Sequence, residues 1–195
     1  EGGEDHHGHG GGAQDFFGDA AEHEARESAP PVGRHDHQRR ALFGRGVEEW
    51  QACAEAGLPV TVIPGVSSSI AVPGLAGVPL THRHLTQGFV VVSGHVAPDD
   101  ARSDVDWDAL ARLGLTIVVL MGVAALPEIA ERLISAGMDP STPAASIADG
   151  GMTSQRQVRS TLAALPGAAA EQDIGAPAVT VIGPAVAALL PQTSV

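Results

Sequence analysis

Three residue types are missing from this 195-residue chain, and a fourth occurs once. The sequence has no lysine, no asparagine and no tyrosine, and Cys53 is its single cysteine. One cysteine excludes an intramolecular disulfide and any zinc site that needs several thiolates, so we expect a reduced, cytoplasmic protein. No run of 18 apolar residues occurs, so no membrane span is predicted. The acidic, Gly/His-rich start lacks the pattern of a signal peptide.

Positive charge is also scarce. All 11 basic residues are arginines, and 23 acidic residues bring the formal net charge to −12. Proteins that bind nucleic acids neutralise several phosphates with cations. We therefore expect neither a nucleic-acid partner nor attachment to an anionic membrane.

Residues 1–40 differ in composition from the rest of the chain. They hold six of the nine histidines and nine of the 23 acidic residues, but few apolar ones. A segment that buries so little apolar surface does not offset its chain entropy, so we predict a low-order tail. Four of its histidines could be ligands for a transition metal, which leaves a metal-handling protein as an alternative function. No predicted scaffold surrounds them, so we expect no metal site. These histidines are His6, His7, His9 and His23.

From residue 42 onward, apolar strands alternate with amphipathic helices, which predicts an α/β layered fold. The strand at 116–121 is apolar on both faces, as in the centre of a covered sheet. Trp50, Trp107 and Cys53 are expected to be buried, and Ser103 is expected to cap a helix that ends at Gly114. The helices are predicted near 47–58, 66–76, 103–113, 126–136 and 158–165, and the strands at 59–63, 89–92, 116–121, 143–147 and 179–182.

Several short segments rich in glycine and polar residues follow the predicted strands. In open α/β sheets, ligands bind beyond the carboxyl ends of the strands. These segments are therefore the candidates for a site: Phe43–Gly46, Pro64–Ser68, Pro79–Arg83, Ser93–His95, Met121–Gly122, and Asp149–Gly150 with Gln155–Arg156.

Taken in order from Leu42 to about Ala188, these motifs resemble the S-adenosylmethionine-dependent uroporphyrinogen-III C-methyltransferases, a branch of the tetrapyrrole methylase family. The resemblance covers the C-terminal three-fifths of such an enzyme. Pro-Leu-Thr-His-Arg and Ser-Gly-His favour this branch over the cobalamin-pathway, diphthamide and rRNA relatives. The residues that carry the likeness include Gly77-Val-Pro-Leu-Thr-His-Arg, Val92-Ser-Gly-His, Val119-Leu-Met-Gly and Asp149-Gly.

The resemblance implies the tetrapyrrole methylase fold, with the cofactor in a cleft between two α/β domains. Residues 79–195 would form a complete C-terminal domain, and residues 41–78 a remnant of the N-terminal one. The implied cofactor is S-adenosylmethionine, and the implied reaction methylates uroporphyrinogen III to precorrin-2, on the route to sirohaem and cobalamin, in a homodimer. The implied cofactor contacts are Leu42, Ser67, Ser68, Met121, Gly150, Pro177 and Ala178, and the substrate contacts are Arg45, His82, Arg83 and His95.

The resemblance stops abruptly before Ala41. The family has Gly-Gly-Asp-Pro there, whereas this chain reads His37-Gln-Arg-Arg. We interpret residues 1–40 as an out-of-frame or decayed translation, which would predict Gly-Gly-Asp-Pro in another reading frame of the gene. The family's acid/base positions have no counterpart, so no catalytic residue is assigned.

Two readings stay open: a methyltransferase with impaired activity, and a non-catalytic remnant that acts only as a dimerisation or binding module. Under both readings, we expect apolar surface of the first domain to be left exposed.

Overall fold

The computed structural model describes residues 46–188. The predicted tail at 1–40 and the predicted site residues Leu42 and Arg45 lie outside this range. The described residues all belong to one compact unit, Ala41–Val195. No helix among them is long and apolar enough to cross a membrane.

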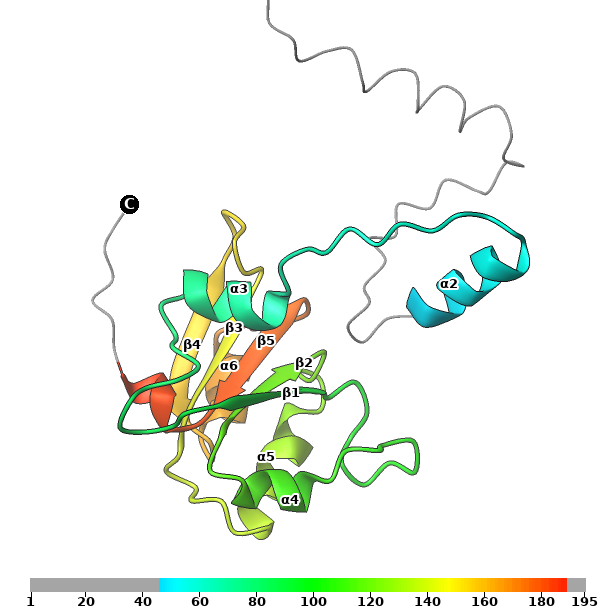
Figure 1. Ribbon diagram of the computed structural model, residues 1–195. Coiled ribbons are helices and arrows are strands. Elements are labelled where there is room, and N and C mark those ends of the chain that lie inside the picture. The colour runs from blue at the N-terminus through cyan, green and yellow to red at the C-terminus, as the bar shows by residue number, and fades with distance from the viewer. Residues whose placement is uncertain (1–45, 189–195) are drawn as a thin grey trace, which may run out of the picture. The chain divides into compact units, whose positions relative to one another are not determined.

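A five-stranded mixed sheet forms the framework (Figure 1). Its strands lie in the order β1-β2-β5-β3-β4, with β1 and β2 parallel and the other pairs antiparallel. All five residues of β2 are buried, and β2 lies between β1 and β5, which confirms the covered interior strand expected from its apolar sequence. The strands are β1 (Phe89–Ser93), β2 (Thr116–Leu120), β3 (Pro143–Ala148), β4 (Arg156–Thr161) and β5 (Ala178–Ile182).

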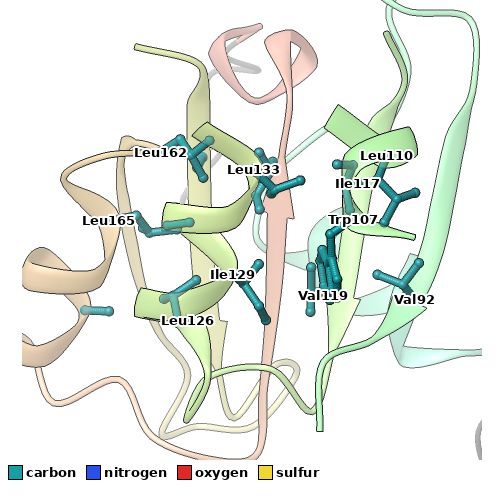
Figure 2. Packing of buried hydrophobic residues seen from close by; sticks show 14 of the residues in the cluster. Val92, Trp107, Leu110, Ile117, Val119, Leu126, Ile129, Leu133, Leu162 and Leu165 are labelled. Atoms are coloured by element: carbon teal, nitrogen blue, oxygen red, sulfur yellow. The ribbon is translucent and has the colours of Figure 1, made fainter. Parts of the chain in front are cut away.

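Helices cover both faces of the sheet. The larger core cluster joins Ile117 and Val119 of β2 to α4 (Trp107–Arg112), α5 (Leu126–Ser135) and α6 (Leu165–Glu171), as Figure 2 shows. The smaller cluster joins Val118 and Leu120 to α3 (Ser68–Leu75) and the 3-10 helix η1 (Pro184–Ala187). Successive side chains of a strand point to opposite faces, so β2 contributes to both clusters.

Helix ends follow the expected signals with one exception. Gly114 and Gly137 have positive φ angles of 66° and 103° just after α4 and α5, where glycine avoids the cost of a Cβ. The N-cap of α4 is Asp106, not Ser103, because the Asp106 carboxylate accepts a hydrogen bond from Ala109 N at 2.9 Å.

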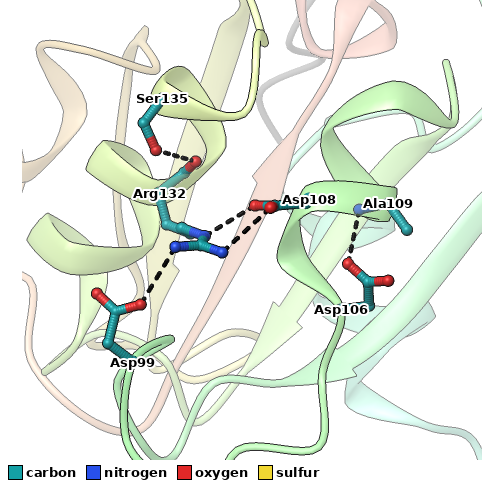
Figure 3. A network of polar contacts seen from close by, with 6 residues as sticks. All are labelled: Asp99, Asp106, Asp108, Ala109, Arg132 and Ser135. Atoms are coloured by element: carbon teal, nitrogen blue, oxygen red, sulfur yellow. Dashed lines mark hydrogen bonds and ion pairs between the residues drawn. The ribbon is translucent and has the colours of Figure 1, made fainter.

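An arginine on α5 ties that helix to α4 (Figure 3). Arg132 donates from Nε and Nη2 to the two carboxylate oxygens of Asp108, at 2.8 and 3.1 Å, and from Nη1 to Asp99 at 3.3 Å. The Arg132 side chain is 40% exposed, so solvent screens these pairs and their stabilisation is at most about 1 kcal/mol.

The helix predicted at 158–165 is wrong. Val158 lies on strand β4, Leu162 follows that strand, and Leu165 begins α6. All three residues are buried in the same core cluster, although they belong to a strand, a turn and the start of a helix. Their spacing along the chain matches that of a helix by coincidence. The regular spacing of these three apolar residues therefore reflects burial in the folded core and does not indicate a helix.

The buried strand predicted at 59–63 is also wrong. These residues form no helix or strand, and Val62 and Ile63 are 59% and 87% exposed. A strand needs a neighbour to satisfy its backbone, and none of the described strands pairs with this segment. The expected exposure of apolar surface is confirmed here.

The helix predicted at 47–58 forms as α2 (Gly46–Glu55), but its apolar stripe is not buried. No residue of α2 is buried, Trp50 is 54% exposed, and Cys53 is half-buried. The burial predicted for Trp50 and Cys53 is therefore wrong, whereas Trp107, at 3% exposure, confirms its prediction. Helical periodicity shows which face is apolar, but burial needs a partner for that face.

Candidate functional site

One edge of the sheet collects most of the predicted cofactor-binding loops. Ser93 at the end of β1 pairs with Leu120 at the end of β2, which pairs with Val179 at the start of β5. Across β5, Ala178 pairs with Ala148 at the end of β3. The loops that follow β1, β2 and β3 and the loop that precedes β5 therefore meet at this edge, which we call the loop edge.

Two glycines let the first two loops of the loop edge touch. A Cβ on Gly94 would lie 2.9 Å from Gly122 Cα and 2.7 Å from Val119 Cγ1, and a Cβ on Gly122 would lie 2.5 Å from the same methyl group. Gly94 N also donates to Leu120 O at 2.8 Å. The loop after β1 is thus held directly against the loop after β2.

Met121 and His95 are exposed residues close to the strand ends in these two loops. Met121 has a left-handed φ of 58° and is 48% exposed, although it follows a fully buried strand. Such a backbone is costly for a non-glycine residue and is found most often at functional sites. His95 is exposed, and its Nδ1 lies 3.1 Å from Ser93 Oγ, in hydrogen-bond contact. The structure brings Met121 and His95 to the same edge.

The third and fourth loops contribute Gly150 and Pro177, and Ala178 is the first residue of β5. Asp149, at a φ of 52°, donates its backbone N–H to Pro177 O at 3.0 Å. The Ala176–Pro177 peptide is cis. The hydrogen bond places the Asp149–Gly150 turn beside Pro177.

Gly150 has a second neighbour, on α3. A Cβ on Gly150 would lie 2.3 Å from Val72 Cγ1. Packing against α3 is therefore enough to require glycine at this position, whether or not a ligand also approaches it.

Ser67 and Ser68 stand at the start of α3. Ser67 is the N-cap: its Oγ accepts a hydrogen bond from Ser69 N at 3.2 Å and lies 2.8 Å from Ser69 Oγ. The half-buried Ser68 hydroxyl has no hydrogen-bond partner within residues 46–188. Ser68, more than Ser67, therefore has a hydroxyl available to a ligand.

His82 and Arg83 lie at the other end of β1. His82 N donates to Thr86 O at 2.9 Å, and Thr86 Oγ1 donates to Gly88 O and Gly114 O, which precede β1 and β2. The structure thus brings His95, but neither His82 nor Arg83, to the loop edge. Leu42 and Arg45 are not among the described residues.

Two arginines near the loop edge form local ion pairs. Arg156, at the start of β4, lies 3.4 Å from Asp173. After β1, the side-chain hydrogen bond from Arg102 holds the pKa of Asp100 well below its usual range. No group of three or more histidine, cysteine or acidic residues that could hold a metal occurs in the part of the chain that the structure describes.

Sequence reasoning missed the contacts that hold this site together. The Asp149-Gly150 pair was a visible turn signal, but nothing local indicated that Val72 packs on it. Arg159 was not singled out, although its Nη2 donates to Ala76 O and Gly77 O, both at 3.0 Å. An apolar hollow of about 400 Å³ between α5 and α6 contains none of the predicted site residues.

Comparison with known proteins gives a consistent result. Residues 41–166 match the family model of the tetrapyrrole (corrin/porphyrin) methylases. A protein of Methanosarcina barkeri named S-adenosyl-L-methionine-dependent uroporphyrinogen III methyltransferase is 43% identical over 145 residues, which are 74% of this chain and 57% of that protein. A siroheme synthase of Gluconacetobacter diazotrophicus is 41% identical over 145 residues, again 74% of this chain but 31% of that protein.

Solved structures show the same relationship. Uroporphyrin-III C-methyltransferase of Thermus thermophilus, crystallised with S-adenosylhomocysteine, has a TM-score of 0.62 and 34% identity, over 76% of this chain and 64% of that one. A cobalt precorrin-4 methyltransferase shares the fold, with a TM-score of 0.68 at 23% identity, over 75% of this chain and 61% of that one.

This chain spans a little over half the length of the archaeal relative and about a third of the siroheme synthase. The match begins at residue 41, immediately before the first motif of the predicted resemblance. The family model covers more than half of the chain, and the chain therefore belongs to the tetrapyrrole methylase family.

Proposed function

We propose that this chain is the C-terminal part of an S-adenosylmethionine-dependent uroporphyrinogen-III C-methyltransferase, which makes precorrin-2 for sirohaem and cobalamin. The observation that carries the proposal is the 43% identity over 145 residues to the archaeal methyltransferase. The arrangement of the loop edge supports it, because four loops that the family resemblance names are brought together there.

The loop edge fits one wall of an S-adenosylmethionine site. Met121 offers an exposed, adaptable apolar side chain, and Ser68 offers a free hydroxyl at the start of a helix. Gly150 and the Pro177–Ala178 turn present backbone with no bulky side chain. When bound, S-adenosylmethionine supplies an electrophilic methyl group, and the task of these residues is to hold and orient it.

The substrate would meet the same edge. Uroporphyrinogen III carries several carboxylates, and His95 and Arg156 are the side chains near the edge suited to contact them. His95 and Arg156 would hold the substrate so that one of its pyrrole carbons faces the methyl group that S-adenosylmethionine would supply. His82 and Arg83 stay predicted substrate contacts, on the evidence of their motif alone.

Calorimetric titration of the chain with S-adenosylhomocysteine tests the proposal. We expect saturable binding, and we expect Met121→Ala to weaken it about tenfold by removing apolar contact. Leu113→Ala, at a 49% exposed position after α4 and at the opposite end of β2 from the loop edge, is the control and should leave the affinity unchanged. No binding by the unaltered chain would refute the proposal for this chain.

The second candidate is the non-catalytic remnant. The exposed apolar stretch at 58–66 favours it, because it shows a surface that nothing among the described residues covers. It predicts stable folding with no ligand binding and no transfer of labelled methyl groups to uroporphyrinogen III. The homodimer and the cytoplasmic location stay predictions, and analytical ultracentrifugation would decide the first.

A further inference from the structure

Helix α3 connects the candidate ligand site to the sheet, and only one of its faces is buried. It has eight residues with Pro73 and Gly74 among them, and Ile70 and Leu75 are 53% and 66% exposed. The segment before it, 58–66, is exposed and makes no regular structure. The position of its first turn, with Ser67 and Ser68, therefore depends on the few contacts that the rest of the helix makes.

One of these contacts is steric. Val72 sits on Gly150, close enough that no side chain fits between them. This contact fixes the distance between the middle of α3 and the β3–β4 loop. Val72 and Ala76 also pack against the sheet in the smaller core cluster, but apolar contact is non-directional, so the direction of α3 depends on the polar contact at its C-terminal end.

The second contact is polar and lies at the other end of α3. Arg159, on β4 opposite Ala145, donates from Nη2 to Ala76 O and Gly77 O. A guanidinium at a helix C-terminus satisfies carbonyls that have no partner in the helix and interacts favourably with the helix dipole. Within residues 46–188, no other side-chain hydrogen bond joins α3 to the sheet.

We propose that Arg159 is a positioning residue for the ligand site at the loop edge. The steric stop at Gly150 and the guanidinium clamp at Ala76 and Gly77 together fix the direction of α3, and this sets where Ser67 and Ser68 stand. Arg159 lies three residues along β4 from Arg156, about 10 Å from the edge, so it acts through the helix and not by touching the ligand. The inference rests on the proposed function for the identity of that ligand.

The test compares Arg159→Met with a control on the other face of the sheet. Arg132→Met removes another partly buried arginine, which bonds to Asp108 of α4 and to Asp99 and makes no hydrogen bond to α3. We expect Arg159→Met to raise the Kd for S-adenosylhomocysteine about tenfold. Arg132→Met should lower Tm comparably without changing the Kd, and Arg159→Lys should restore most of the affinity. Equal weakening by both methionine variants would show only general destabilisation and would overturn the inference.

Hydrogen exchange separates this inference from the proposed function. In Arg159→Met, the amides of Ala71 and of residues 76–78 should exchange about tenfold faster, while those of β2 keep their rates. If the unaltered chain binds no S-adenosylhomocysteine, the proposed function fails, and the exchange of α3 alone decides the inference. Unchanged amide exchange rates in α3 of Arg159→Met would contradict the proposal that the Arg159 hydrogen bonds hold this helix in place.

Discussion

At the scale of single residues, contact with a neighbour explains Gly150 better than conformational freedom does. Its φ is not in the left-handed region, but a Cβ would lie 2.3 and 2.5 Å from the two methyl groups of Val72. Gly94 and Gly122 are constrained in the same way where two loops touch. At these three positions the absence of a side chain is itself the structural requirement.

We expect Gly150→Ala to lower the free energy of unfolding by about 1–3 kcal/mol, because the methyl group overpacks the contact with α3. Adding Val72→Ala removes the two clashing methyl groups and should restore part of the lost free energy of unfolding. The restoration is only partial because the Cβ of residue 72 would still lie 2.8 Å from the new Cβ at position 150. Gly167→Ala is the control, because Gly167 lies in α6 with no atom near the position of a Cβ. It should raise the free energy of unfolding by about 0.5–1 kcal/mol. Urea titration measures all three; a neutral Gly150→Ala would contradict the packing.

Asp100 and Arg102 form a pair whose effect is visible by titration. The Arg102 guanidinium and backbone N–H lower the pKa of Asp100, so the contribution of this carboxylate to stability is present above its unfolded value of about 3.9. That contribution disappears as pH falls through the lower folded pKa. We expect Arg102→Met to return the pKa of Asp100 towards its ordinary value, as measured by NMR of the carboxyl carbon.

Asp139 provides an internal reference for that titration. The N–H and hydroxyl of Ser141 lower the pKa of Asp139, with no arginine involved. Its titration should be the same in Arg102→Met as in the unaltered chain. A shift of both carboxyls would point to a general change in the protein and not to the loss of one pair.

At the scale of elements, strands formed where partners were available. Residues 89–93 and 116–120 are short and apolar and became paired strands, whereas 59–63 has a similar composition and did not. The different outcome for these segments is explained by strand pairing and not by intrinsic β-propensity. An extended segment gains backbone hydrogen bonds only beside another strand.

The segment at 58–66 should therefore tolerate polar substitution. We expect Val62→Ser with Ile63→Ser to leave Tm nearly unchanged and to reduce the binding of a hydrophobic dye, because both side chains are exposed. Val181→Ser, at a position with 0% exposure, is the control and should lower Tm strongly. A large loss of stability in the double variant would mean that the segment is packed in solution.

At the scale of the whole molecule, the buried clusters lie between residues 72 and 186. The family match also begins only at residue 41. Within the described residues 46–188, the apolar burial that stabilises the fold therefore lies in residues 72–186. The tail at 1–40 lies outside the described residues and outside the family match.

We expect a chain of residues 41–195 to keep the Tm and the metal content of the full chain. The physical reason is that both hydrophobic clusters are retained intact. Thermal melting followed by circular dichroism measures the first quantity, and elemental analysis the second. A lower Tm or a loss of bound metal would instead support a structural or metal-binding role for the histidine-rich tract.

The sequence alone determined the fold class and the family, because strand and helix patterns are local and the motifs keep their order and spacing along the chain. It also located Met121, Gly150 and Pro177 in loops, since glycine, proline and strand ends can be recognised from the neighbouring residues.

Only the tertiary structure decided which apolar faces are covered. Trp50 and Ile63 are exposed and Leu162 is buried, although all three looked equally apolar in the sequence. It also decided that His95 reaches the loop edge while His82 does not, and that Arg159 clamps α3 across 82 residues of sequence. Burial and such contacts depend on which partner lies opposite, and pairing between distant segments is not encoded in either segment alone.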